Sequence, residues 1–482
     1  MTIITDFPAD NYLPGVGIEF DFFTGSRSSE TDDRRMLIIG TMRSTGTATA
    51  EKQYQVLDEG HADTLFGIGS EVALMARAAL ATVRDLGLGA PEIYAIGVAE
   101  PGAGTAASGT FTITGAPTAA GEVIVRIAGR TVRAAVASGD SVTTIAQSLV
   151  AAINAMEREI PVLASNVAGV VTVTYRHKGT NGNDVIIENA NGVGLLPEIA
   201  AGVVSTVSGA NLASGAGVID ITNALAAAKS RDFWEIAVSN NEAADMTDLD
   251  THLDETWATM TDQYRFAQVV DIDSTSAATT LAGADDERIR VASCPGARSL
   301  PCEIAAALSA MVTGRERPNY NHCGSELPLY GPDVDDNLTP TEQNTLIKAG
   351  VTPLISTPRG KLKVVRLVST RTTANSVANR TLMDHAIAYT LARVARQIDD
   401  EITATINARN LDDGLKKDLK SVAMNVLRSR ERAGWLQNVE AHKDEVIAET
   451  HPTNDSRVVM RLPANVVKIA AQAVAKVALV SP

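Results

Sequence analysis

The sequence predicts an α/β protein of several domains: a main domain with a parallel-rich sheet, a small inserted α+β domain, and a C-terminal α+β domain with extended N- and C-terminal arm strands. Three observations lead to this prediction. Apolar strands alternate with helices in two separate blocks, as in parallel sheets. Linkers of small residues bound the stretch between these blocks. Both ends carry apolar strands with no local hairpin partner. A length of 482 residues fits two to four domains.

The composition excludes several classes of protein. Lys and Arg number 42 against 57 Asp and Glu, so the formal net charge is −15. An acidic chain without a basic stripe is a poor match for a phosphate backbone, so we expect no nucleic-acid partner. No apolar run reaches about 18 residues, and the N-terminus lacks a signal-peptide pattern, so we expect no membrane insertion. Three cysteines without a CxxC pair favour folding in a reducing cytoplasm.

The predicted N-terminal arm covers residues 1–34. Its apolar side chains alternate with Gly17, Glu19 and Asp21, which is the period of a strand with one buried face. These apolar residues are Val16, Ile18, Phe20 and Phe22. Residues 26–33 are polar and charged, so we expect a flexible connector there.

The main α/β domain is predicted to be discontinuous, from residues 35–100 plus 218–338. The first block reads as a strand at 36–40, a helix at 62–86 and a strand at 92–98. We interpret residues 67–71 as a helix interior or a bend, because the serine falls one place late for a nucleophile elbow. In the second block we expect helices at 220–229, 247–264 and 300–313, and strands at 233–239, 267–272 and 288–293.

The inserted outer domain is predicted at residues 101–217, between linkers at 101–109 and 205–215. We expect strands at 110–114, 122–127, 131–136, 170–175 and 184–188, and a helix capped by Ser141 that runs to about residue 156. Because the two ends of an insertion must meet, this domain should protrude from the main domain.

The C-terminal assembly domain is predicted at residues 339–465. We expect strands at 351–355 and 362–368, long helices at 383–408 and 415–433, and strands at 444–449 and 457–462. Residues 466–482 form the predicted C-terminal arm, whose strand residues are Val477, Leu479 and Val480.

Two patterns resemble ligand-binding motifs but depart from them. Gly102, Gly104 and Gly109 miss the spacing of GxGxxG, so a linker is the better interpretation. Residues 333–344 begin like a calcium loop, but Leu338 stands where glycine is needed and Asn344 where the bidentate Glu is needed. A solvated turn explains them.

No pattern supports a nucleophile or a metal centre either. No known signature frames His322 with Cys323, Cys294 and Cys302, and we expect the cysteines to be buried small hydrophobes. The histidines lack metal-ligand spacing. We therefore predict no catalytic, cofactor or metal site, and a protein that is not an enzyme.

The arms carry opposite charges. Residues 1–26 hold Asp6, Asp10, Glu19 and Asp21 without Lys or Arg, whereas residues 463–482 hold Lys468 and Lys476 without an acid. Unpaired strands can join the sheet of another subunit, and opposite charges would favour register between arms. The alternative is that both strands pair within the chain.

Three segments resemble contractile phage tail sheath proteins of the Mu-like subgroup. The stretch 338–354 resembles their short helix running into a glycine turn and a strand, although Thr352 replaces the usual Asn. Pro14-Gly15-Val16 resembles the opening of their N-terminal arm. Thr370-Arg371-Thr372-Thr373, followed by the helix at 384–399, resembles their C-terminal region.

The resemblance implies a structural subunit of a contractile tail sheath, with no cofactor. Six subunits would form a ring, and rings would stack around a tail tube, linked by arms that add strands to neighbours. The sheath would then shorten and drive the tube through the host envelope. The implied partners are neighbouring sheath subunits, the tail tube protein, and the baseplate and tail terminator proteins. We expect the subunit in the virion tail, after assembly in the host cytoplasm. An α/β enzyme with an unrecognised site and a surface adhesin are the alternatives.

Overall fold

A computed structural model describes residues 34–190, 199–257, 263–374, 377–378, 381–406, 410, 412–451 and 454–468. All seven predicted arm-strand residues lie outside this part of the chain: Val16, Ile18, Phe20, Phe22, Val477, Leu479 and Val480.

A nine-stranded sheet forms the centre of the described chain, in the order β14-β16-β15-β13-β12-β11-β1-β3-β2. The six strands from β15 to β3 run parallel, while β2, β16 and β14 pair antiparallel at the two edges. The parallel-rich sheet predicted from the sequence is therefore confirmed. Its strands are β1 (Arg35–Thr41), β2 (Gln53–Val56), β3 (Glu92–Val98), β11 (Glu235–Val238), β12 (Phe266–Asp271), β13 (Ile289–Ser293), β14 (Glu326–Tyr330), β15 (Val351–Ser356) and β16 (Lys361–Val364).

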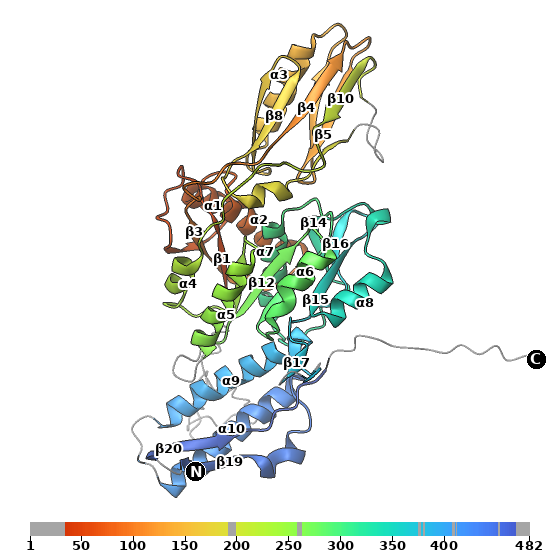
Figure 1. Ribbon diagram of the computed structural model, residues 1–482. Coiled ribbons are helices and arrows are strands. Elements are labelled where there is room, and N and C mark those ends of the chain that lie inside the picture. The colour runs from red at the N-terminus through yellow and green to blue at the C-terminus, as the bar shows by residue number, and fades with distance from the viewer. Residues whose placement is uncertain are drawn as a thin grey trace, which may run out of the picture. The chain divides into compact units, whose positions relative to one another are not determined.

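Helices cover both faces of this sheet (Figure 1). Met36 and Ile38 of β1 point into the core that contains α2 and α7, while Leu37 and Ile39 point into the core that contains α4, α5, α6 and α8. A strand buried on both faces needs a continuous apolar run, as β1 has. The helices are α1 (Glu59–Phe66), α2 (Glu71–Asp85), α4 (Thr222–Ala228), α5 (Ala243–Trp257), α6 (Thr275–Leu281), α7 (Pro301–Thr313) and α8 (Pro340–Lys348).

The single helix predicted at 62–86 is wrong, because the chain breaks between α1 and α2. Gly67 and Gly69 have φ of 88° and 71°, which glycine adopts without a steric penalty. Ser70 then caps α2, and its side chain accepts a hydrogen bond from the Ala73 backbone N–H. The residues at 67–71 thus form the bend that the sequence allowed.

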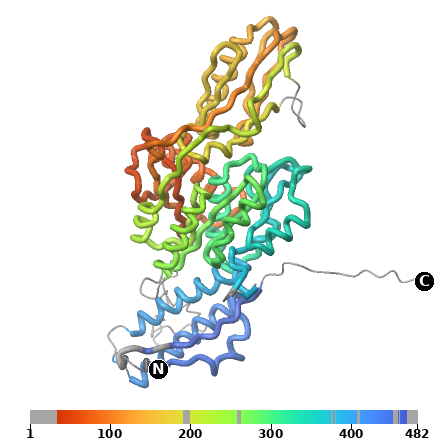
Figure 2. The backbone as a smooth tube through the Cα atoms, in the orientation of Figure 1, coloured from red at the N-terminus to blue at the C-terminus, as the bar shows by residue number. Residues whose placement is uncertain are grey.

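Residues 108–207 build two smaller sheets around helix α3 (Val142–Ala155). The first has the order β10-β4-β8-β7 and the second β6-β5-β9. Isolated bridges join Thr105 to Ala216 and Ser108 to Ala213, so the chain enters and leaves through one narrow neck (Figure 2). The strands are β4 (Ser108–Gly115), β5 (Gly121–Ile127), β6 (Arg130–Val136), β7 (Val162–Val167), β8 (Val170–Tyr175), β9 (Ile187–Asn189) and β10 (Val203–Val207).

Strands β15 and β16, which follow helix α8, belong to the central sheet, and the C-terminal domain at residues 339–465 stays a prediction. Strand β15 pairs in parallel with β13, and β16 folds back antiparallel onto β15. Sequence pattern shows that a strand exists but not which sheet it joins.

The remaining described chain contains α9 (His385–Ile406), α10 (Asp413–Arg432), β19 (Ile447–His451) and β20 (Asn454–Arg461), with a short pair β17 (Thr373–Ala374) and β18 (Val377–Ala378) before them. Short 3-10 helices lie at Thr180–Asp184, Ala282–Ala284, Val334–Asp336 and Glu440–Glu445.

Glu71 at the start of α2 ties the neck domain (residues 105–216) to the central sheet. Its carboxylate accepts hydrogen bonds from the Tyr175 hydroxyl at 2.7 Å and the Asn181 amide at 3.1 Å. It also accepts the Thr41 backbone N–H at 3.2 Å. A buried carboxylate held by three donors fixes the two layers against each other, because losing one partner would leave a charge poorly solvated.

Asp184, which lies near Glu71, makes the stability of the folded chain depend on pH. Burial, together with the negative charges of Asp273, Asp271, Glu71 and Glu242, raises the pKa of Asp184 from 3.8 to about 8. The folded state therefore binds this proton more tightly than the unfolded chain, so stability is highest below the unfolded pKa and falls as the pH rises toward 8.

Asp184→Asn should remove the loss of stability that the parent protein shows as the pH rises. We expect the melting temperature of the variant to exceed that of the parent by a margin that grows between pH 5 and pH 8.5, as measured by scanning fluorimetry. The exposed residue Asp335 offers the matched control Asp335→Asn, which should show no such trend. A margin that is constant with pH would contradict the assignment.

Candidate assembly site

Strands β19 and β20 form an isolated antiparallel hairpin, called the hairpin below. Ile447 pairs with Arg461 and Ala448 with Met460, and the register shifts beside Thr450. Within the described residues this sheet has no third strand, so the outer edge of each strand carries backbone groups without a sheet partner. A two-stranded sheet is marginal by itself, and open edges are templates for further strands.

One face of the hairpin rests on the two long C-terminal helices. Helix α10 contacts β19, and Met460 packs against a separate core that contains Val394, Leu427 and Trp435. The chain after β20 is also anchored there, because Gln437 N–H donates to Asn465 C=O at 2.8 Å and Val467 N–H donates to Trp435 C=O at 3.0 Å. The hairpin is thus held on a base with its own core, while its edges have no sheet partner among the described residues.

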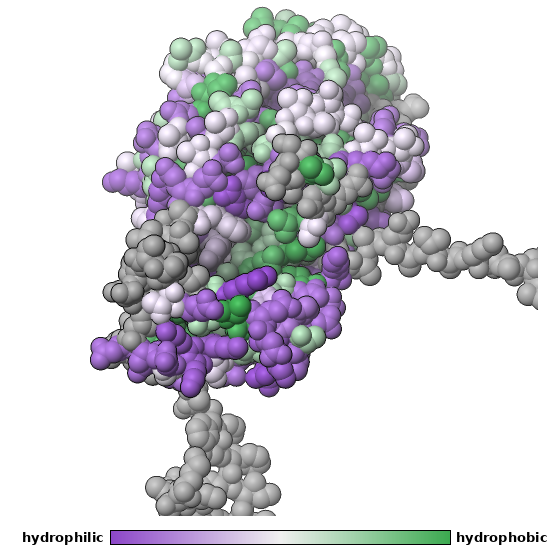
Figure 3. Space-filling view, turned by 60° about the horizontal axis from the view of Figure 1, so that its bottom comes forward, coloured by the Kyte–Doolittle hydropathy of each residue, from purple (hydrophilic) through white to green (hydrophobic). Residues whose placement is uncertain are grey.

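Among the residues whose side chains the structure describes, the other face of the hairpin is exposed and carries Glu449 on β19 and Arg461 on β20. Ile447 is 39% exposed, and Glu449 and Arg461 are also exposed. Among the described residues, neither Glu449 nor Arg461 takes part in an ion pair or a side-chain hydrogen bond. Hydrophilic residues cover most of the described surface on the side of these helices, and apolar residues gather in the middle of the view (Figure 3).

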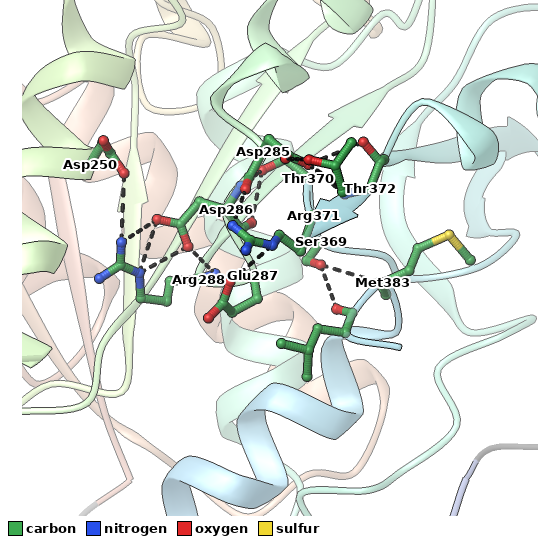
Figure 4. A network of polar contacts seen from close by, with 12 residues as sticks. Asp250, Asp285, Asp286, Glu287, Arg288, Ser369, Thr370, Arg371, Thr372 and Met383 are labelled. Atoms are coloured by element: carbon green, nitrogen blue, oxygen red, sulfur yellow. Dashed lines mark hydrogen bonds and ion pairs between the residues drawn. The ribbon is translucent and has the colours of Figure 1, made fainter. Parts of the chain in front are cut away.

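A connector, residues 366–374, leads from the central sheet toward α9 and is bound tightly at its centre (Figure 4). The Asp285 carboxylate accepts the backbone N–H groups of Thr372 at 2.6 Å and Thr373 at 3.0 Å. It also accepts both of their hydroxyl groups. Although partial burial opposes it, these hydrogen bonds lower the pKa of Asp285. Asp285 itself has φ of 50°, an uncommon backbone state for a residue other than glycine.

Neighbouring contacts extend this anchor along the connector. The Thr370 hydroxyl accepts the Asp286 backbone N–H at 2.9 Å and donates to the Asp286 carbonyl at 2.8 Å. Arg371 donates to the Asp285 carbonyl at 2.9 Å. The residues 370–373 singled out in the sequence therefore fasten the connector to the loop before β13.

A buried ion pair holds the start of α9 to the same sheet. Glu235 on β11 and Arg290 on β13 are fully buried and bonded to each other, and His385 lies 3.1 Å from the second guanidinium nitrogen. Burial and the positive charge of Arg290 lower the pKa of His385 well below its usual range, so this imidazole is neutral. Together with the connector, this contact makes a firm joint between the central sheet and the base of the hairpin.

The cysteines that the sequence placed as small hydrophobes have unreactive surroundings. Cys294 and Cys302 are buried. Burial raises the pKa of Cys294 to about 12 and that of Cys302 well above its usual range. Burial also raises the pKa of Cys323 and lowers that of the neighbouring His322 to about 3. A thiol that resists ionisation is a poor nucleophile.

The structure and the sequence point to different parts of the chain. The predicted arm strands lie outside the described residues, whereas the hairpin was predicted as two strands without a role. Two signals in the sequence could have identified the hairpin. Its strands, predicted at 444–449 and 457–462, lie outside the two blocks of alternating helices and strands, and only two strands are predicted there. Within the described residues, no helix combines the length and the apolar character needed to cross a membrane.

Asp285→Ala should loosen the joint. Four hydrogen bonds to a carboxylate are lost, so we expect about 2 kcal/mol less stability in urea unfolding at pH 7, and faster hydrogen exchange at the Thr372 and Thr373 amides. Asp285→Asn keeps one acceptor and tolerates the backbone state, so its effect should be smaller. Equal exchange rates in all three proteins would show that the carboxylate does not hold the connector.

Comparison with known proteins gives one curated relative and several solved folds. No protein-family model matches the chain. The Mu-like prophage FluMu tail sheath protein of Haemophilus influenzae is 32% identical over 183 residues. This match covers 37% of the chain and 36% of the relative, so it spans only about a third of that protein.

The solved structures match over nearly the whole chain. The crystal structure of a sheath tail protein from Desulfitobacterium hafniense has a TM-score of 0.52 and 15% identity, covering 95% of this chain and 98% of that one. A sheath tail protein from Listeria innocua also has a TM-score of 0.52, with 12% identity, and covers 90% of this chain and 92% of its own. The helical sheath of the anti-feeding prophage, in its contracted state, has a TM-score of 0.52 with 11% identity and covers 97% and 99%. The chain therefore has the fold of tail sheath proteins, and its predicted resemblance to contractile phage tail sheath proteins of the Mu-like subgroup is confirmed.

Proposed function

We propose that this chain is the structural subunit of a contractile tail sheath. Subunits assemble as stacked rings of six around a tail tube, and the polymer shortens to drive the tube through the host envelope. The observation that carries the proposal is the open hairpin on its own helical base, together with strand-forming sequences at both ends of the chain. The prophage sheath of the same fold, solved as a contracted helix, supports a helical polymer.

The arms have the length to reach other subunits. Fully extended, residues 1–33 span about 110 Å and residues 469–482 about 45 Å. A strand from one copy that joins the hairpin of the next makes a head-to-tail contact, and contacts of this type form rings or helices. Backbone hydrogen bonds supply the affinity in such strand addition.

Contraction requires contacts that persist and contacts that exchange. We propose that the contacts of the sheet around the hairpin persist during contraction. The joint made by Asp285, Arg290 and the connector also persists, so that a movement of the hairpin base moves the central sheet with it. The contacts between central sheets exchange, and the lattice moves to the arrangement of lower free energy. The polar segment 26–33 provides slack for the N-terminal arm.

The same proposal sets the partners and the place of action. We assign the inner surface of the polymer to the tail tube protein and its two ends to baseplate and tail terminator proteins. The subunit acts in the virion tail after assembly in the host cytoplasm. No described side-chain arrangement favours catalysis. A ligand-dependent rise in melting temperature across a metabolite panel would favour the enzyme alternative.

Deleting residues 1–25 should leave a folded chain that does not polymerise. The purified full chain should form hollow tubes with a helical lattice in negative-stain electron microscopy, while the truncated chain should remain as small particles with the same circular dichroism. Tubes of normal length from the truncated chain would refute the role of the N-terminal arm. Small particles from the full chain under all salt conditions would refute the sheath itself.

Removing the domain beyond the neck should leave polymerisation intact. Thr105 and Ala216 lie side by side, so a short glycine linker can join residues 104 and 217. This removal also takes Tyr175 and Asn181 from Glu71 and Arg130 from Glu303, so Glu71→Gln and Glu303→Gln are included to avoid unpaired buried charges. The full chain with these two substitutions alone is the matched control. Loss of tubes only in the shortened chain would contradict an outward, dispensable position of this domain.

A further inference from the structure

The outer face of the sheet β10-β4-β8-β7 in the neck domain carries no charged side chain. Its other face points into the core through Phe111, Ile113, Val171 and Val173, so the alternate residues of each strand point outward. The ladders align these outward residues in rows across the four strands. The outward residues of these described strands are Ser108, Thr110, Thr112 and Thr114 on β4, Leu163, Ser165 and Val167 on β7, Val170, Thr172 and Thr174 on β8, and Val204 and Thr206 on β10.

Such a face is unusual for a sheet that is exposed to water. Antiparallel sheets commonly turn polar and charged residues toward the solvent, as the neighbouring sheet β6-β5-β9 does with the ion pair between Arg133 and Glu122. The uncharged face instead exposes aliphatic side chains, since Val167 is 82% exposed, Val204 53% and Leu163 52%. Exposed apolar side chains gathered on one face indicate a contact surface.

Helix α3 gives the neck domain a second surface without charge. Its residues Ile145, Leu149 and Ile153 are buried in the core, and it contacts β7, β4 and β8 from the inner side of the sheet. Among the described helices longer than eight residues, α3 is the only one without a charged residue. The uncharged faces of the helix and the sheet therefore point away from each other, so one chain cannot cover its own sheet with its own helix. The exposed residues of α3 are Thr144, Gln147, Ala151 and Ala155.

The charge distribution favours a second copy of the chain as the partner of these faces. The neck domain has 13 charged residues among its 112, seven acidic and six basic, whereas the whole chain has a net charge of −15. Copies of an acidic chain repel each other. This repulsion is smallest where two copies meet through surfaces that carry no charge.

We propose that the exposed face of α3 in one copy packs on the outer face of the sheet β10-β4-β8-β7 in the next copy. This inference rests on the function proposed above and adds a contact between neck domains. Covering a sheet with a helix is a common form of packing, and the small side chains of Ala151 and Ala155 let the helix approach closely. Because the contact joins two different surfaces, each copy can bind one neighbour on either side, as a repeating polymer requires.

The size of the sheet face limits what this contact can do. Four strands about 4.8 Å apart, each with about five residues of about 3.4 Å, cover roughly 300 Å². A stable interface buries about 800 Å² on each partner, so free subunits should not associate through this face. Subunits that other contacts already hold side by side meet at a high effective concentration, at which a weak contact forms. The contact therefore adds to an assembled polymer and is not needed to build one.

Cross-linking of substituted residues in the full-length chain tests this contact. Ser165→Cys and Ala151→Cys are combined, and the polymer is treated with a short bismaleimide. Denaturing electrophoresis should show a ladder of dimers, trimers and longer chains from the polymer, and no ladder from dilute, unassembled subunits. Adding Thr172→Lys should lower the yield of the ladder by about tenfold, because the contact would cover an unpaired charge. Arg133→Cys with Ala151→Cys, which uses the charged sheet, is the matched control and should give no ladder.

Each other outcome has a definite meaning. Dimers from Ser165→Cys alone would show that two sheet faces meet. A polymer without a ladder would show that α3 does not cover the sheet, and an equal ladder from the control pair would show that the link reflects crowding. These three outcomes overturn the inference and leave the sheath function standing, whereas failure of the parent chain to polymerise would overturn the proposed function. The parent chain also gives the background from the half-buried Cys323.

Discussion

A backbone N–H or C=O at the edge of a sheet needs a partner, and this requirement dominates the C-terminal part of the molecule. In the nine-stranded sheet, seven strands have a neighbour on both sides and helices cover the faces, so only β14 and β2 present an outer edge. In the hairpin, within the described chain, both strands are edge strands. Two long helices support this small sheet, which is consistent with a role in binding an additional strand.

A surface that receives a strand is useful in a moving assembly only if it is attached firmly to the rest of the subunit. The attachment here is polar. Asp285 holds two consecutive threonines through both backbone and hydroxyl groups, and Arg290 is buried between Glu235 and His385. Such groups are costly to bury and costly to separate, because each broken contact leaves a charge without solvent. Hydrogen bonds and ion pairs are directional, so they also fix the orientation of the connector and of α9 on the sheet. An apolar contact between the same elements would not do this.

Much of the fold follows from local pattern. The apolar run at residues 36–40 predicts a buried parallel strand, and β1 is one. Helix caps and glycines mark most of the helix ends, and Gly67 explains why one predicted helix is two. Pairing between distant segments is harder to predict, because a strand's sequence records its buried face and not its neighbour. For this reason the sequence predicts the strands at 351–355 and 362–368 but not their pairing in the central sheet, and it predicts two strands at the hairpin but not that they pair with each other. The joint is a further example, since no local pattern connects Asp285 with Thr372, 87 residues later.

The neck at residues 105–216 has a consequence for how such a chain can change over generations. Its two chain segments meet at a pair of bridges, so the chain enters and leaves the domain beyond them at one place. A different folded unit with ends about 5 Å apart could take this place without moving the central sheet. It would have to replace the side chains that now meet the central part of the chain: Tyr175 and Asn181 donate to Glu71, Arg130 pairs with Glu303, and Glu188 pairs with Arg298. The neck thus separates a domain whose sequence can diversify from the central sheet, whose sequence is constrained by its own core.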